Sequence, residues 1–331
     1  MLVFCYTSDM SKIRVAVLRG GPSSEYEVSL KTGESILKHL PEEKYHAHDV
    51  FIDKNGLWHM RGRSIEPRQA LEQNDVVVNA LHGEWGEDGK VQRLLETFGI
   101  PYTGSKALSS AIAMNKALAK EHVKRAGIKT AQGTLLNVAH DIGKRIHELF
   151  RSLPLPAVIK PVDKGSSVGV SIARDWFEFN EGLRKAFEVS PNILIEEYIR
   201  GKEATAGVID NFRGEELYAL LPVEIVPPKN TFYDYDSKYI SDETDYRIPG
   251  SFSREERMEL MRLAKAVHQT LGLRHYSRSD FIVSPRGIYF LEANTLPGMT
   301  SHSLIPKSLN AIGATLPQFL DHIITLALER R

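Results

Sequence analysis

Residues 155–173 read LPAVIKPVDKGSSVGVSIA, and this stretch is the most informative about the fold. Two short apolar runs at its ends predict two strands joined by a glycine-rich loop. The loop is not a Walker loop, because it lacks a G-x-x-x-x-G-K-[ST] run and no helix follows it. Its Gly-Ser-Ser amides at 165–167 could bind phosphates, with Lys160 as a point charge at the strand end. The alternative is an ordinary hairpin turn with a solvated lysine.

A second candidate site lies in SRSDFIVSPRGIYFLEANT, residues 277–295, which predicts a hairpin around its Pro-Arg-Gly turn. Side chains alternate between faces along a strand, so Asp280 should fall opposite Glu292, with Asn294 on the same face. Two carboxylates and an amide oxygen that face together suit Mg²⁺. The alternative is a solvated hairpin face that carries an exposed Arg278–Asp280 pair.

The first half of the chain alternates strand and helix signals, which predicts a mostly parallel sheet. Strands are expected at 13–18, 45–53 and 75–81. Ser24 and Glu27 have the spacing of a capping box at the start of the helix after the first strand. We therefore expect an N-terminal α/β domain over residues 11–104, preceded by a leader at 1–10.

The rest of the chain is expected to form two further lobes. Residues 105–192 would be a central lobe that carries the glycine-rich loop, and residues 193–331 a C-terminal lobe. Within the latter, residues 222–250 show no sustained period and are rich in Pro, Tyr and Asp. A loop of this length in a compact protein is usually a functional lid or disordered.

Composition narrows the class of protein. The chain has 331 residues, and its 42 Lys+Arg balance 42 Asp+Glu, so we expect no nucleic-acid partner that depends on a broad basic field. The single cysteine, Cys5, excludes an intrachain disulfide and a cysteine metal cluster. No run approaches the roughly 20 apolar residues of a membrane helix, and the start is a poor signal peptide. We therefore expect a cytoplasmic protein without a membrane partner.

Several single residues are weaker candidates, and each has a structural alternative. Glu25 lies at a helix start where the helix dipole favours a carboxylate anyway, and His82 follows a buried strand at its carboxyl end. Lys116 and Lys120 lie one turn apart on a predicted helix, and Lys238-Tyr239 lie in the aromatic loop. Taken together, these elements suggest an ATP–Mg²⁺ site between two lobes, with a small anionic substrate nearby.

From about residue 13 to the C-terminus the sequence resembles the D-alanine–D-alanine ligase family of the ATP-grasp superfamily. Seven runs carry the resemblance in the correct order and spacing: VAVLRGGPSSEYEVSLKTG, NALHGEWGEDGKVQRLLETFGIPYTGS, AMNKALAK, VIKPVDKGSSVGVS, ILIEEYIRGKE, FYDYDSKYISDET and LEANTLPGMTSHSLIP.

The resemblance implies an α/β protein with a three-lobed ATP-grasp fold: an N-terminal open, mostly parallel sheet domain and two ATP-grasp lobes of α+β character. ATP would bind between the central and C-terminal lobes. The residues implied to bind it are Lys116, Lys160, Gly165, Ser166, Ser167, Val168, Glu196, Glu197, Ile199, Glu203 and Lys238. Two Mg²⁺ ions, with Mn²⁺ as a possible substitute, would be held by Asp280, Glu292 and Asn294.

The resemblance also implies where two D-alanines bind. Glu25 would receive the ammonium of the first, with His82 near its carboxylate, and Ser166 and Tyr239 would complete a hydrogen-bonded trio with Glu25. The second carboxylate would meet Ser303 and the backbone of Leu304. The oxyanion hole would be formed by Arg278 and the N–H of Gly298.

The implied activity is ATP-dependent formation of D-alanyl-D-alanine through a D-alanyl phosphate, for peptidoglycan precursor synthesis. A homodimer in a bacterial cytoplasm is expected, and Tyr239 implies a dipeptide rather than a D-lactate product. The alternatives are a ligase that uses D-serine or D-lactate as second substrate and a non-catalytic ATP-binding regulator. A dinucleotide oxidoreductase is excluded, because no G-x-G-x-x-G follows the first strand.

Overall fold

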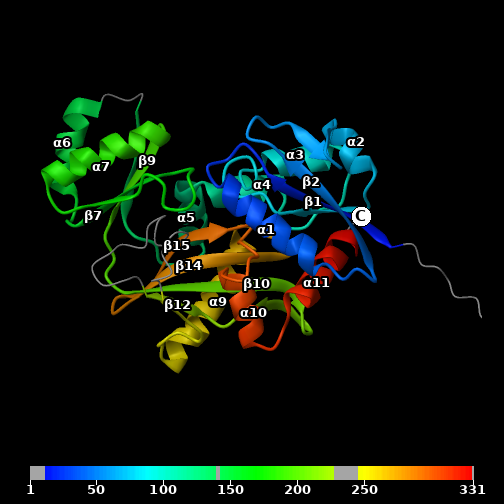
Figure 1. Ribbon diagram of the computed structural model, residues 1–331. Helices are drawn as coiled ribbons and strands as arrows, with labels where there is room; N and C mark the ends of the chain where they lie inside the picture. The colour runs from blue at the N-terminus through cyan, green and yellow to red at the C-terminus, as the bar shows by residue number, and fades with distance from the viewer. Residues whose placement is uncertain (1–11, 139–141, 227–244, 330–331) are drawn as a thin grey trace, which may run out of the picture.

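The computed structural model describes residues 12–138, 142–226 and 245–329, and it consists of three lobes, each built on its own sheet (Figure 1). The expected α/β class with three sheets is confirmed. The predicted leader at 1–10, Lys238 and Tyr239 lie outside the described residues, as does most of the expected lid.

The N-terminal domain is a five-stranded sheet in the order β4-β3-β2-β1-β5. The strand β1 lies between β2 and β5 and is parallel to both, as predicted, whereas β3 and β4 extend the sheet by antiparallel pairing. The four β1 residues 15–18 are fully buried, because both faces of the sheet are covered, which is why the strand is a continuous apolar run. The elements are β1 Ile13–Gly20, α1 Tyr26–His39, β2 Tyr45–Ile52, β3 Trp58–Met60, β4 Arg63–Ser64, α2 Pro67–Glu72, β5 Val76–Asn79 and α3 Lys90–Thr97.

The helix α1 does not start with the predicted capping box. Its N-cap is Glu25, which makes no capping hydrogen bond through its side chain. The Ser24 hydroxyl instead donates to Glu84 Oε2 at 3.1 Å, so a contact 60 residues away replaces the local one. A capping box does occur at Ser253 and Glu256, at the start of the later helix α9, Arg254–Thr270.

The central lobe is an antiparallel sheet in the order β6-β9-β7-β8, covered by α6 and α7. The predicted strands on either side of the glycine-rich loop are β7 and β8, which pair directly. Strand β9 pairs with β6 and β7, so it belongs to this sheet although the C-terminal lobe was expected to begin at residue 193. The elements are β6 Gly133–Asn137, α6 Ile142–Ser152, β7 Ala157–Pro161, β8 Ser171–Ala173, α7 Trp176–Val189 and β9 Asn192–Glu197.

The C-terminal lobe is a six-stranded sheet in the order β13-β12-β10-β14-β15, with β11 also paired to β10. Helices α4 and α5 share a core with this sheet and with α9, so residues 107–125 pack here rather than in the expected central lobe. The reason is that the apolar face of α5, with Ala119 and Val123, meets Phe290 and its neighbours. The elements are α4 Ala107–Met114, α5 Lys116–Arg125, β10 Lys202–Phe212, β11 Glu215–Ala219, β12 Val223–Val226, β13 Asp245–Arg247, α9 Arg254–Thr270, β14 Tyr276–Ser284, β15 Gly287–Asn294, α10 Leu304–Ala311 and α11 Leu316–Glu329.

The N-terminal and C-terminal lobes also share a core, whereas the central lobe has its own. Val15 and Val17 of β1 belong to one buried cluster with Ile305 of α10 and Phe319 of α11. In Figure 1 the helix α11 accordingly lies beside α1, between the two sheets.

In the described part of the chain, no single helix has the length and apolarity to cross a membrane; α10 and α11 meet that test only as a pair, bent by 106°.

Candidate active site

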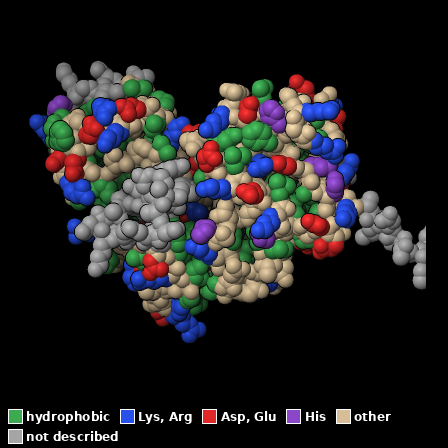
Figure 2. Space-filling model, viewed as in Figure 1, with side chains coloured by type: hydrophobic (Ala, Val, Ile, Leu, Met, Phe, Trp, Pro, Cys, Tyr) green, Lys and Arg blue, Asp and Glu red, His purple; other side chains and the backbone are tan. Residues whose placement is uncertain are grey.

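One cavity of about 150 Å³ collects most of the predicted site residues. It lies where the three lobes meet, and Figure 2 shows the surface hollowed between the central lobe and the N-terminal domain. The predicted residues that line it are Glu25, His82, Lys116, Gly165, Ser166, Arg278, Asp280, Glu292, Asn294, Gly298, Ser303 and Leu304.

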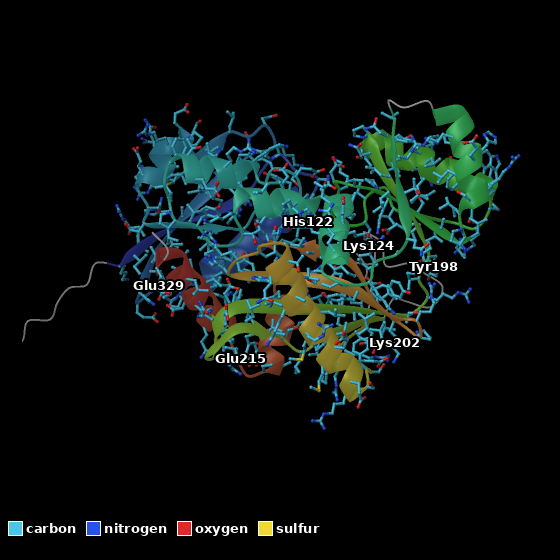
Figure 3. All side chains as sticks on the ribbon, turned by 180° about the vertical axis from the view of Figure 1, so that it is seen from behind. His122, Lys124, Tyr198, Lys202, Glu215 and Glu329 are labelled. Atoms are coloured by element: carbon cyan, nitrogen blue, oxygen red, sulfur yellow. The ribbon has the colours of Figure 1, made fainter. Side chains whose placement is uncertain are left out.

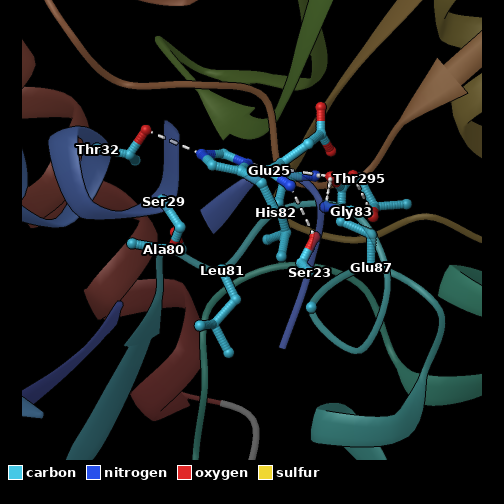
Figure 4. Close-up of polar contacts among 12 residues, drawn as sticks. Ser23, Glu25, Ser29, Thr32, Ala80, Leu81, His82, Gly83, Glu87 and Thr295 are labelled. Carbon is cyan, nitrogen blue, oxygen red and sulfur yellow. Dashed lines mark hydrogen bonds and ion pairs between the residues drawn. The ribbon is translucent and has the colours of Figure 1, made fainter. Parts of the chain in front are cut away.

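Glu25 lies on the N-terminal wall of this cavity and is buried. Two glycine backbones from different lobes pass close to its carboxylate: a Cβ atom on Gly83 would lie 2.7 Å from Oε2, and one on Gly165 would lie 3.0 Å from it. A side chain at Gly83 would force the Glu25 carboxylate to shift, and one at Gly165 would be in tight contact with it. The glycine-rich loop of the central lobe therefore packs directly against the carboxylate of the N-terminal domain (Figure 4 shows Glu25 and Gly83).

His82 is buried at the carboxyl end of β5, and its Nε2 lies 2.8 Å from the Thr32 hydroxyl (Figure 4). Burial and, to a lesser extent, the nearby positive charge of Arg278 lower the pKa of His82 to about 4. A hydrogen bond with the Leu296 backbone has the opposite effect and raises the pKa in part. The ring is therefore uncharged near neutral pH, where it can hydrogen-bond a carboxylate but cannot form an ion pair with it.

Glu87 is a buried carboxylate of the site that the sequence analysis missed. It accepts hydrogen bonds from Gly83 N at 3.1 Å, Thr295 Oγ1 at 3.3 Å and Leu296 N at 3.2 Å (Figure 4). Burial raises the pKa of Glu87. The residue joins the loop after β5 to the loop after β15, so it positions two walls of the cavity. The acidic GEDG run after the strand was the available signal.

The β14–β15 hairpin has the predicted register, with Asp280 opposite Glu292 and Arg278 opposite Asn294. Arg278 holds Asp280 through Nε and Nη2, both at 3.0 Å, and the Thr205 hydroxyl donates to Asp280 Oδ1 at 2.5 Å. The Arg278–Asp280 pair of the alternative reading therefore exists, but it faces the cavity rather than solvent.

The donors on this hairpin fit a hard cation. Asp280, Glu292 and Asn294 present two carboxylates and an amide to the same cavity, and Mg²⁺ commonly takes one or two carboxylates and completes its shell with water and phosphate oxygens. Within the described ranges no group of three or more His, Cys, Asp or Glu side chains could hold a metal by itself. A cation bound here would complete its shell with the Asn294 amide, water or phosphate oxygens.

Lys160, which is predicted to bind phosphate, belongs to a buried cluster of two lysines and one glutamate. Lys160 Nζ lies 2.5 Å from Glu196 Oε2, and Lys120 Nζ contacts Oε1 of the same carboxylate. Burial and the charge of Lys160 lower the pKa of Lys120; for Lys160, attraction to Glu196 outweighs burial and raises the pKa. When both lysines are protonated the cluster has one excess positive charge, which attracts phosphate. Lys120 was one of the weaker candidates in the sequence, on the same helix face as Lys116, but it was not among the residues that the resemblance implied for ATP.

The glycine-rich loop has an unusual backbone. Ser166 and Ser167 have φ angles of 48° and 60°, a region that non-glycine residues seldom occupy and that is often found at ligand sites. Lys116 Nζ donates to the carbonyl oxygen of Lys164 at 2.5 Å and lies 3.1 Å from Glu292 Oε2. Lys116 therefore joins the loop to the carboxylates of the hairpin.

The C-terminal wall carries the residues predicted for the second substrate. Ser303 is the N-cap of α10 and Leu304 its first residue, so first-turn N–H groups without an intrahelical acceptor lie at the cavity. A Cβ atom on Gly298 would lie 2.8 Å from Ser303 Oγ, so only glycine fits beside that hydroxyl.

Other predicted ATP residues lie outside the cavity lining. Glu197 accepts from Arg286 Nη2 at 3.0 Å, and Ile199 packs against Tyr289. The chain here passes from the central lobe to the C-terminal sheet, between the labelled residues Tyr198 and Lys202 of Figure 3. The residues of this group, whose ATP contacts stay a prediction, are Lys160, Ser167, Val168, Glu196, Glu197, Ile199 and Glu203.

Comparison with known proteins agrees with this geometry. A family model described as "D-ala D-ala ligase C-terminus" matches residues 122–325, and "D-ala D-ala ligase N-terminus" matches residues 14–74 and 59–105. A D-alanine–D-alanine ligase from Citrifermentans bemidjiense is 39% identical over 320 residues, which cover 96% of this chain and 97% of the relative.

Two solved structures have the same fold. The D-alanine–D-alanine ligase from Bacillus anthracis complexed with ATP has a TM-score of 0.78 and 33% identity, covering 96% of this chain and 97% of its own. The VanG D-Ala:D-Ser ligase from Enterococcus faecalis has a TM-score of 0.83 and 30% identity, covering 96% and 99%. The shared fold, the two family matches and the near-complete coverage lead to one conclusion: the chain belongs to the D-alanine–D-alanine ligase family.

Proposed function

We propose that this chain joins two D-alanines into D-alanyl-D-alanine and converts one ATP to ADP and phosphate, as a step in peptidoglycan precursor synthesis. The observation that carries the proposal is a shared cavity whose lining includes Glu25, the hairpin carboxylates and the start of α10. Family membership supports the reaction, and the relative solved with ATP supports the nucleotide.

In the first step, a carboxylate oxygen of the first D-alanine attacks the γ-phosphorus of ATP, and the bond to the ADP oxygen breaks. Glu25 binds the ammonium of this substrate and neutral His82 hydrogen-bonds its carboxylate. Two anions must approach each other, so the positive charges of Lys116, Lys160 and Arg278 lower the barrier by offsetting their repulsion. The product is D-alanyl phosphate.

Asp280, Glu292 and Asn294 would hold Mg²⁺, or Mn²⁺ in its place. When bound, the cation supplies charge neutralisation at the phosphate oxygens. The hairpin itself contributes position, because Arg278 and Thr205 fix the Asp280 carboxylate toward the cavity.

In the second step, the free amine of the second D-alanine attacks the acyl carbon and phosphate leaves. The start of α10 at Ser303 and Leu304 binds the carboxylate of this substrate. As the amine adds, negative charge forms on the former carbonyl oxygen, and this oxyanion is stabilised by Arg278 and by the N–H of Gly298. We further propose that Tyr239 favours this dipeptide product, and that the enzyme acts as a homodimer in the bacterial cytoplasm.

The decisive experiment measures ADP and dipeptide together, with ATP, Mg²⁺ and D-alanine, and with L-alanine as the control. We expect stoichiometric ADP and D-alanyl-D-alanine, and neither with L-alanine. Adding D-serine or D-lactate in competition tests the second substrate, since one relative is a D-Ala:D-Ser ligase. Preferred incorporation of D-serine would show that the product is D-alanyl-D-serine and not D-alanyl-D-alanine. ATP binding without ADP formation would favour the alternative of a non-catalytic ATP-binding regulator.

A further inference from the structure

An ion pair joins two lobes beside the cavity, outside the residues used by the mechanism above. Lys164 Nζ lies 2.6 Å from Glu84 Oε1. Lys164 belongs to the glycine-rich loop between β7 and β8 of the central lobe, whereas Glu84 belongs to the loop between β5 and α3 of the N-terminal domain. Both side chains are about three-quarters buried, with exposed fractions of 22% and 24%.

Glu84 is anchored on its own side. Its second oxygen, Oε2, accepts hydrogen bonds from the Ser24 hydroxyl at 3.1 Å and the Ser23 hydroxyl at 3.2 Å. These serines directly precede Glu25, the proposed ligand of the first D-alanine. Although burial opposes ionisation, Lys164 and these hydrogen bonds keep the pKa of Glu84 below its usual value, so the carboxylate is charged near neutral pH.

Lys164 is anchored on the nucleotide side. Its carbonyl oxygen accepts from Lys116 Nζ, which also lies 3.1 Å from Glu292. The next residue, Gly165, packs against the Glu25 carboxylate. The backbone of Lys164 is therefore held by Lys116, a proposed phosphate ligand. Its side chain is held by Glu84, in the same loop as His82 of the proposed first-substrate site.

We propose that the Glu84–Lys164 ion pair is a latch that holds the glycine-rich loop against the N-terminal domain and thereby couples binding of ATP to binding of the first D-alanine. The coupling rests on the proposed function; the latch itself does not. Since the latch acts through the loop and touches no reacting atom, Glu84 and Lys164 are positioning residues. Losing either charge leaves the other partly buried without its partner, so the loop should detach more often.

The first measurement is hydrogen exchange of a peptide that contains residues 162–170, in the free protein and with a non-hydrolysable ATP analogue. We expect faster exchange in Glu84→Gln and in Lys164→Met, with no further increase in the double variant. This readout does not depend on turnover, so it tests the latch even if no dipeptide is made.

The second measurement is steady-state kinetics. Each single variant should raise KM for the first D-alanine and KM for ATP by about 3- to 5-fold, which is the upper range for a partly exposed pair, with kcat changed less than about 2-fold. In the wild type 0.5 M NaCl should raise KM in the same way, because salt screens the pair, and it should change the variants less.

The matched control is Glu215→Gln, which removes the Glu215–Lys265 pair of 2.8 Å within the C-terminal lobe (Glu215 is labelled in Figure 3). It should change neither loop exchange nor KM. The latch is refuted if the single variants exchange like the wild type, or if their effects add fully in the double variant. Absence of dipeptide from the wild type, with loop exchange changed as expected, would refute the proposed function and keep the latch.

Discussion

His82 and Glu87 lie in one loop, and burial shifts the pKa of each toward its uncharged form. The two shifts have opposite consequences for stability as the pH falls. The folded chain binds a proton at the buried histidine less readily than the unfolded chain does, so acid lowers the stability of the fold through His82. At the buried glutamate the folded chain binds a proton more readily, so acid raises the stability through Glu87. The pH dependence of this protein therefore has to be read from variants at one position at a time.

Replacing His82 by Gln should remove this residue's contribution to the loss of folding stability at acid pH. The pKa is about 4 in the folded chain and about 6.5 when unfolded, so between these values only the unfolded chain binds the proton. The wild type should lose roughly 3 kcal/mol of stability from this group as the pH falls from 6.5 to 4, at 1.36 kcal/mol for each pKa unit. Above pH 6.5 the group contributes no pH dependence.

Chemical unfolding of wild type and His82→Gln at several pH values checks this. The unfolding free energy of the wild type minus that of His82→Gln should decrease as the pH falls from 6.5 to about 4, because only the wild type loses stability through this histidine. The exposed His147 supplies the control, and His147→Gln should keep the wild-type profile. A constant difference between wild type and His82→Gln would show that His82 is not the group responsible.

Two glycines allow sterics at the site to be separated from general stability. Gly298→Ala should lower kcat/KM by about 10- to 100-fold, because the new methyl group meets Ser303 Oγ and displaces the proposed oxyanion donor. Gly313→Ala, at a φ of 71° with no atom near the added Cβ, should cost about 1 kcal/mol in stability and leave kcat/KM unchanged. Steady-state kinetics and melting curves on both variants measure these effects. Full activity in Gly298→Ala would contradict the prediction.

At the scale of elements, the β14–β15 hairpin converts a spacing in the sequence into a shared face. From the turn, direct pairing runs as far as Phe281 opposite Phe290, and one extra residue in β15 then brings Glu292 opposite Asp280. The strand period places Asn294 on the same face as Glu292. Pairing continues on both sides of this register shift, so the irregularity changes which residues face each other and does not end the ladder.

Glu292→Gln should weaken divalent-cation binding at this hairpin, since it removes one of two carboxylates. We expect the Kd for Mn²⁺ in the presence of ADP, followed by electron paramagnetic resonance, to rise at least about 10-fold. Glu259→Gln, in an exposed ion pair on α9, is the control and should bind Mn²⁺ normally. Unchanged Mn²⁺ binding in Glu292→Gln would remove this residue from the metal site.

At the scale of the whole molecule, the three lobes are joined unequally. The N-terminal and C-terminal lobes share one apolar core, whereas the central lobe has its own core and meets α5 through polar contacts. The buried cluster of Lys120, Glu196 and Lys160 is the clearest of these, because Lys120 comes from α5 and the others from the central sheet.

This cluster predicts very different effects from neighbouring substitutions. Glu196→Gln leaves two buried lysines without a counter-charge and should cost about 3 kcal/mol or more. Lys120→Met leaves the Lys160–Glu196 pair intact and should change stability by less than about 1 kcal/mol. Unfolding midpoints followed by tryptophan fluorescence check the comparison, and equal losses in both variants would show that the excess positive charge is not what matters.

Local pattern determined much of this protein. The buried β1 strand, the glycine-rich loop between β7 and β8 and the pairing of β14 with β15 were all predictable, because each depends on residues within about twenty positions of one another. At that range, the alternation of side chains and the length of the turn leave only one or two ways for the strands to pair.

Only the tertiary structure decided the contacts between lobes. Ser24 turned to Glu84 instead of capping α1, Glu87 reached the loop after β15, and α4 and α5 packed on the C-terminal sheet. The physical reason is that a local hydrogen bond contributes only about 1 kcal/mol, so the packing of whole elements overrides it. Which charged side chain finds which partner across a lobe boundary therefore follows from how the lobes bury their apolar faces, and no spacing along the chain records that.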